Sequence, residues 1–158
     1  MTDSQSLTAK IASLYSPIIA KLETFGPPVA DLAVRLWIGL MFFRSGLQKI
    51  GDWESTLFLF EYEYALPIIP FELAAYFGTA AELAMPILLF IGLASRLAAL
   101  PLLGMALTIQ FVLGASSPAY NDYNHFAWMT FLLVIIARGP GKLSIDHWLR
   151  QKFMPGQN

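Results

Sequence analysis

Six polar side chains with useful chemistry stand in or beside segments that are otherwise apolar. They are Arg44, Gln48, Glu82, Gln110, Asn124 and His125. A guanidinium and a carboxylate can form an ion pair, and a histidine can carry a proton near neutral pH because its unperturbed pKa is about 6.5. Amide side chains both donate and accept hydrogen bonds. Such a set has the chemistry to hold and protonate a small oxygen-rich molecule.

The segments around these residues are long enough to cross a lipid bilayer. A helix needs roughly 20 mostly apolar residues to do so, and four segments approach that length: 29–50, 71–94, 97–115 and 123–137. The fourth is the shortest. Of the 158 residues, 56% are hydrophobic and 13% are charged, and a charged share of about 25% is usual in soluble domains. The sequence therefore predicts an all-α fold, an integral membrane four-helix bundle in 29–138, in preference to a soluble helical bundle.

The charges of the connecting segments predict the direction of the helices. Segment 51–70 holds four acidic residues and no lysine or arginine, and segment 116–122 holds one acid and no base. Basic residues occur instead in 1–28, at Arg96 and in 139–158. Because short cytoplasmic loops are enriched in lysine and arginine, we expect both termini on the cytoplasmic side.

Both ends of the chain are expected to lie at the membrane surface. Apolar residues recur at helical spacing in 1–28: Leu7, Ile11, Leu14, Ile18, Leu22 and Phe25. This pattern predicts an amphipathic interfacial segment, bent or broken at Pro17, although a loosely ordered tail is the alternative. Segment 139–158 is expected to form a second interfacial helix with Ser144 as its N-cap. Between the first two spans we expect a short helix over the outer mouth of the bundle, ending at Pro67 and Pro70.

The polar side chains of the four spans are expected at similar depths in the membrane. With a rise of about 1.5 Å per residue, each span contributes one polar residue to a layer between the middle of the membrane and its outer surface. Ionisable groups at that depth cost a few kcal/mol each, so they usually face the bundle interior and pair. We expect an ion pair between Arg44 and Glu82, proton transfer at His125, and hydrogen bonds from Gln110 and Asn124.

The remaining polar residues of the first span have simpler expected positions. Gln48 lies just above the layer. Arg35 is expected to anchor the cytoplasmic end by extending its head group to the interface, and Lys49 to reach the outer head groups. The whole polar layer also has a plainer interpretation, since hydrogen bonds between membrane helices, at about 0.6 kcal/mol each, fix helix packing without any ligand.

Several classes of site are excluded. The chain has no cysteine, which removes disulfides, thiolate zinc sites and iron–sulfur clusters. The two histidines, His125 and His147, are expected at opposite ends of the bundle, so no metal site is expected. The net charge of -1 gives no reason to expect nucleic acid. We expect no covalent cofactor, and membrane lipid as one partner.

Three motifs resemble the DoxX family of membrane proteins. Segment 35–49 reads RLWIGLMFFRSGLQK, Glu82 is followed by LLFIGLASRLAA at 88–99, and His125 is followed by GPGKLSID at 139–146. Their order and spacing on four spans, within about 29–149, make the combination more specific than any one motif.

The resemblance implies a four-helix protein of a bacterial cytoplasmic (inner) membrane. Members of the family resemble membrane subunits of quinol oxidases and of thiosulfate:quinone oxidoreductases. The resemblance thus implies a subunit of an oxidoreductase system that is quinone-linked, has a protein partner and can form oligomers; it assigns no catalytic residue. Two alternatives remain open: a non-enzymatic membrane anchor or assembly factor, and a small transporter.

Overall fold

The computed structural model describes the backbone of residues 2–65 and 69–154, and the side chains of that part from Ser13 onward. The described residues form helices joined by short connections and contain no strand, which confirms the all-α prediction. The expected end of a helix at Pro67 lies outside the described residues, as do the side chains of Leu7 and Ile11.

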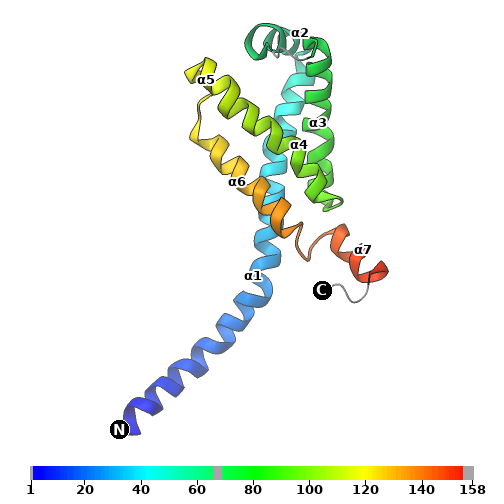
Figure 1. The fold of residues 1–158 in the computed structure, drawn as a ribbon. Helices are drawn as coiled ribbons and strands as arrows, with labels where there is room; N and C mark the ends of the chain where they lie inside the picture. The colour runs from blue at the N-terminus through cyan, green and yellow to red at the C-terminus, as the bar shows by residue number, and fades with distance from the viewer. Residues whose placement is uncertain (1, 66–68, 155–158) are drawn as a thin grey trace.

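Helix α1 (Thr2–Gly51) is a continuous helix of 50 residues that contains Pro17, Pro27 and Pro28. A helix of that length extends about 75 Å, and its first part projects well beyond the bundle (Figure 1). Of the expected bend or break at Pro17, the break is therefore wrong. The residues around Pro17 are exposed, so a carbonyl that loses its helical partner to proline can still bond water. In this projecting part, Leu14, Leu22 and Phe25 remain exposed.

Three further helices complete the bundle around the second half of α1. They are α3 (Phe71–Ile91), α4 (Ser95–Leu107) and α6 (Tyr123–Arg138). Helix α4 continues through the π-helical turn η2 (Thr108–Leu113) into α5 (Gly114–Ser116). Helices α1 and α4 each pack against both α3 and α6, so the four helices enclose one core. That core includes Ala98, Ala99 and Ala106 on α4, whose small side chains allow close helix approach.

Three of the described helical segments are long and apolar enough to cross a membrane. They are Ser13–Gly51, Phe71–Ile91 and Ser95–Ser116. Helix α6 has 16 residues and is about 24 Å long, shorter than the roughly 30 Å hydrocarbon layer. A membrane protein is therefore supported, whereas the predicted count of four spans is not confirmed.

One end of the bundle, here called the capped end, is covered by short helical segments. Helix α2 (Trp53–Phe58) and the π-helical turn η1 (Leu59–Tyr64) follow α1, and η3 (Pro118–Tyr120) precedes α6. The carboxylate of Asp52 accepts a hydrogen bond from the backbone N–H of Ser55 at 3.0 Å and so caps α2. The tyrosine hydroxyl of Tyr120 donates to Glu63, which links η3 to η1.

The opposite end, here called the tail end, is closed by α7 (Ile145–Phe153). Its Asp146 carboxylate accepts hydrogen bonds from the backbone N–H groups of Ala94 (2.8 Å) and Ser95 (3.1 Å). The N–H of Asp146 donates to the carbonyl of Gly92 at 2.9 Å. Helix α7 is therefore fixed to the turn between α3 and α4, as its position in Figure 1 illustrates.

Arg35 is wholly buried at this end. Its guanidinium donates to the carbonyl of Leu89 at 3.1 Å and to the carbonyl of Leu143. The expectation that Arg35 extends to the membrane interface is wrong. The last carbonyls of α3 carry the negative end of its dipole, and that of Leu89 binds the guanidinium inside the bundle.

Gly92 allows this close arrangement. Its φ is +71°, and a Cβ at this position would lie 2.2 Å from Nη1 of Arg35 and 2.5 Å from Cβ of Ser144. Both the left-handed backbone and the space thus require glycine.

We predict that Gly92→Ala lowers the free energy of unfolding by about 2–4 kcal/mol, from left-handed strain and from overpacking combined. Thermal unfolding of the detergent-purified protein measures this. Gly104→Ala is the control, because a Cβ at Gly104 meets nothing within 4 Å and alanine favours a helix. Equal melting temperatures for the two variants would contradict this account of the tail end.

Candidate ligand site at the capped end of the bundle

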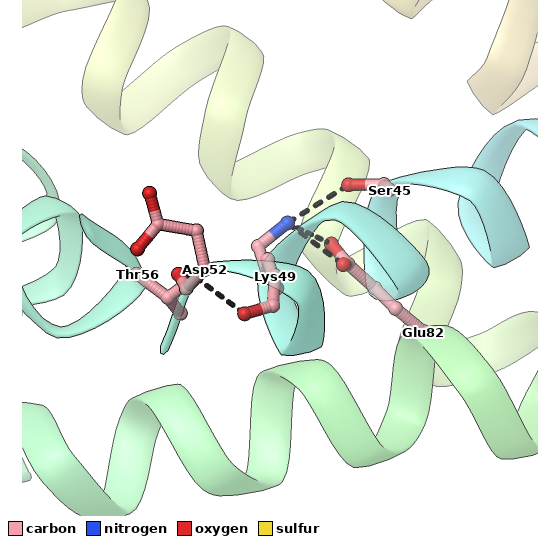
Figure 2. A network of polar contacts seen from close by, with 5 residues as sticks. All are labelled: Ser45, Lys49, Asp52, Thr56 and Glu82. Atoms are coloured by element: carbon pink, nitrogen blue, oxygen red, sulfur yellow. Dashed lines mark hydrogen bonds and ion pairs between the residues drawn. The ribbon is translucent and has the colours of Figure 1, made fainter. Parts of the chain in front are cut away.

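Lys49 on α1 and Glu82 on α3 form a buried ion pair. The Lys49 ammonium lies 2.7 Å from Oε2 and 3.0 Å from Oε1 of Glu82, and it donates to Oγ of Ser45 at 2.8 Å (Figure 2). The two charged side chains are only 11% and 8% exposed. Glu82 therefore has a charged partner inside the bundle, as its depth required.

The partner is not the one that we expected. Arg44 is exposed, so the predicted ion pair between Arg44 and Glu82 is wrong. Lys49 turns inward, so its expected reach to the head groups is also wrong. Arg44 and Lys49 are five residues apart, which separates them by about 140° around a helix, whereas Ser45 and Lys49 share a face.

A close approach of α1 and α3 brings the pair together. A Cβ at Gly46 would lie 2.9 Å from the side chain of Leu83 and 3.1 Å from Cβ of Glu82. Thr56 is buried in the cap and donates to the carbonyl of Lys49 at 2.9 Å (Figure 2). The ion pair, the helix crossing and the start of α2 are thus parts of one arrangement.

A second polar cluster joins α4 and α6. Nδ1 of His125 lies 2.9 Å from Oε1 of Gln110, and Nε2 of Gln110 donates to Oδ1 of Asn121 at 2.6 Å. Because the Gln110 amide donates through its nitrogen, its oxygen accepts from the Nδ1–H of His125. The His125 ring also packs edge-on against Trp128, with centroids 4.7 Å apart. The structure therefore brings Gln110 and His125 together at one depth.

Asn124 does not join this cluster. It is exposed, and both its backbone N–H and its side-chain amide donate to Asp122, at 2.9 and 3.0 Å. Asn121, which we did not select, takes the place next to Gln110. The signal in the sequence was Asp122, a good N-cap, which puts Asn124 in the first helical turn and leaves Asn121 in the preceding connection.

An apolar cavity of about 530 Å³ lies between α3, α4 with η2, and η1. Its walls include Phe60, Phe77, Met105 and Leu113, and Glu82 is the one charged residue among its lining residues. Tyr64 and Thr108 add hydroxyl groups. Ligand sites have volumes of about 300–1,000 Å³ and apolar walls with a few polar groups, so this cavity has the size and chemistry of a small-molecule site.

A more polar cavity of about 500 Å³ lies on the other side of the ion pair. Its lining includes Gln48, Lys49, Asp52, Glu63 and Tyr64. Lys49 thus borders the polar cavity, Glu82 borders the apolar one, and Tyr64 borders both. The ion pair and Tyr64 form the polar boundary between the two spaces.

Two tyrosines in the cap remain protonated at neutral pH. Burial, with the charges of Glu82 and Glu63, raises the pKa of Tyr64 to about 12. Burial and the hydrogen bond to Glu63 raise the pKa of Tyr120 to about 12 as well. Both phenols therefore keep an O–H group that can donate a hydrogen bond, and Tyr64 lies in the wall of the apolar cavity.

The comparisons with known proteins identify the family. A model of the DoxX family matches residues 30–115, more than half of the chain. The chain belongs to the DoxX family. An uncharacterized protein of Haemophilus influenzae is 28% identical over an aligned length of 142 residues, and the alignment covers 84% of this chain and 91% of that protein. No solved structure matches the chain.

The family match confirms the resemblance seen in the motifs. It includes some of the polar groups of this DoxX protein and leaves out others. Lys49, Glu82 and Gln110 lie within the matched residues, whereas Asn121 and His125 lie beyond them. Within the part that the structure describes, no group of three or more His, Cys, Asp and Glu side chains could hold a metal ion. The ion pair and the apolar cavity are therefore the best-defined candidate site.

We predict that Lys49→Met or Glu82→Met alone destabilises the protein by about 3 kcal/mol or more, because each leaves a buried charge without its partner. The double variant should recover more than half of that loss. Thermal unfolding of the four proteins gives the coupling energy, and Arg44→Met should change the melting temperature little. Additive losses in the double variant would show that the two charges do not interact.

Proposed function

We propose that this DoxX protein is a quinone-binding membrane subunit of an oxidoreductase system and that the apolar cavity is its ligand site. One observation supports this most: the cavity of about 530 Å³ has apolar walls but is bordered by a buried carboxylate in an ion pair. A quinone combines an apolar ring and tail with two carbonyl oxygens, and when bound it would supply the capacity to carry electrons and protons.

The residues of the site fit such a ligand. The aromatic and aliphatic walls match a ring with a tail, and the Tyr64 hydroxyl is a protonated donor for a carbonyl oxygen. Lys49 holds Glu82 next to the cavity and itself borders the polar cavity with Gln48, Asp52 and Glu63. Polar side chains therefore extend from the edge of the apolar cavity, through the ion pair, to the polar cavity.

The chain requires a partner for redox chemistry. It has no cysteine and therefore no thiolate-based redox centre, so a separate redox protein in the same membrane complex would supply electrons. His125 and Gln110 bind each other in this proposal and do not belong to the lining of the cavity. They hold α4 against α6.

The ligand test uses Gly104, which lines the apolar cavity and whose added Cβ meets nothing within 4 Å. A leucine there should fill the ligand space without a clash. We predict that short-chain ubiquinone or menaquinone analogues bind the purified protein in nanodiscs and that Gly104→Leu weakens binding about tenfold, roughly 1.4 kcal/mol. Equilibrium binding titration measures this.

Gly26→Leu is the matched control, because Gly26 also has free space around it and lies in the projecting part of α1. Its affinity should equal that of the unchanged protein. Absence of binding by the unchanged protein, or equal affinity of Gly104→Leu, would make the quinone proposal wrong.

The second candidate function is an anchor or assembly factor without a ligand. The closed cluster of His125, Gln110 and Asn121 favours it, because these side chains satisfy one another as packing contacts do. A protein partner that co-purifies equally with the unchanged protein and with Gly104→Leu, with no quinone bound to either, would support this function.

We also propose that the protein lies in the bacterial inner membrane with the tail end in the cytoplasm. The tail end holds Arg96, Lys142 and Arg150, and the capped end holds Asp52, Glu54 and Glu61, a distribution that follows the positive-inside rule.

The absence of native cysteine allows a direct test of this orientation. In intact cells, a membrane-impermeant maleimide should label Glu61→Cys in the cap and should leave Lys142→Cys unlabelled until the membrane is permeabilised. Labelling of Lys142→Cys in intact cells would reverse the proposed orientation.

A further inference from the structure

A groove of about 410 Å³ lies at the tail end between the start of α4 and α7. Arg96 on α4 and Arg150 on α7 both line this tail-end groove, together with the apolar side chains of Leu97, Leu149 and Phe153. Two guanidinium groups from separate helices thus meet apolar walls in one space. Neither arginine takes part in the candidate site at the capped end.

One carboxylate, that of Asp146, also lines the groove. Asp146 uses its two oxygens for the N–H groups of Ala94 and Ser95, and Asp31 lies 3.4 Å from Arg138. Arg96 makes a weak donation from Nη2 to the carbonyl of Ala137 at 3.3 Å. The lining therefore carries two positive charges and one negative charge, a net positive charge.

Helix α7 has the features of a helix at a lipid interface. Trp148, Phe153 and Met154 are exposed apolar side chains. The ammonium of Lys152 lies 4.9 Å from the ring centre of Trp148 and 5.6 Å from that of Phe153, so its charge lies over two exposed aromatic rings. Aromatic side chains mixed with cations are typical of helices that rest on anionic membranes.

The path from the groove toward the bundle is also apolar. Leu97 and Leu100 on α4 are 69% and 50% exposed, and α4 belongs to a helical segment that is apolar enough to cross a membrane. A molecule in the groove therefore finds cations at the membrane surface and, next to them, a surface suited to hydrocarbon chains.

We propose that the tail-end groove is a specific site for one anionic phospholipid, with its phosphate between Arg96 and Arg150 and an acyl chain along Leu97 and Leu100. Arginine pairs bind phosphate through several N–H groups at once, and basic pockets at the cytoplasmic ends of membrane helices bind anionic head groups. An anionic lipid brings negative charge without the cation of a zwitterionic head group. This site is independent of the proposed quinone function.

The test is lipid retention by the full-length protein in detergent, measured by native mass spectrometry. Phosphatidylglycerol should bind more tightly than phosphatidylcholine of equal chain length. Arg150→Gln should weaken phosphatidylglycerol binding roughly fivefold or more, the effect of one arginine near an anionic surface. Arg150 is exposed on α7, so this variant should keep its melting temperature in the absence of added lipid.

Lys142→Gln is the matched control, because it removes a positive charge from the same end outside the lining of the groove. It should change phosphatidylglycerol binding less than twofold, on the order of the effect of a distant screened charge. An equal loss in Lys142→Gln would show that only diffuse charge attracts the lipid and would overturn the proposal. Equal affinity for the two lipids would do the same.

A third arm separates lipid from free phosphate as the source of the anion. Inorganic phosphate should not displace phosphatidylglycerol, since it lacks the chain that contacts Leu97 and Leu100. Displacement at comparable concentrations of the two would assign the groove to a soluble phosphate and overturn the lipid site.

Discussion

The structure depends on the cost of burying charge in an apolar bundle. Glu82 lies near the middle of α3 with 6% of its surface exposed, where an isolated carboxylate would cost several kcal/mol. Lys49 offsets that cost because it turns inward and forms an ion pair with Glu82. This pairing requires α1 and α3 to approach closely at Gly46. Thr56 then binds the carbonyl of Lys49 and fixes the start of the cap. One interaction thus sets the helix register, the position of the cap and the polar wall of the cavity.

The two ends of the bundle bury their charges in different ways. At the tail end, Arg35 and Asp146 bind backbone groups at the end of α3 and at the start of α4. These contacts close the structure at this end. At the capped end, the charges bind each other, and both partners also border cavities. This difference is why a ligand site is proposed at the capped end and why the tail end contributes only its outer arginines to a lipid site.

The sequence predicted the membrane helices and the depth of the polar residues, because apolar run length and helical rise depend on local sequence alone. Depth placed Gln110 and His125 in one layer, and the structure brings them into contact. The side of the helix on which each residue lies was not predicted from the sequence. This is why Arg44 was chosen as the partner of Glu82 in place of Lys49. Asn121 was missed because it lies in an irregular connection, where helical spacing gives no position.

The position of Arg35 depended on tertiary structure for another reason. Its partners are the carbonyls of Leu89 and Leu143, which are 54 and 108 residues away in the chain. Every residue has a backbone carbonyl, so residue types do not show which carbonyls will bind a distant side chain. The family match at 30–115 supports the membrane fold, but a family that shares a fold can differ in its ligands. The occupant of the cavity therefore has to be measured.

The ionisation of Glu82 tests the central claim most directly. Infrared difference spectra between the unchanged protein and Glu82→Gln, recorded in lipid at neutral pH, isolate the vibrations of this one side chain. The account predicts the bands of an ionised carboxylate and their replacement by a protonated carbonyl band in Lys49→Met. A protonated Glu82 in the unchanged protein, or the same bands with and without Lys49, would contradict the ion pair.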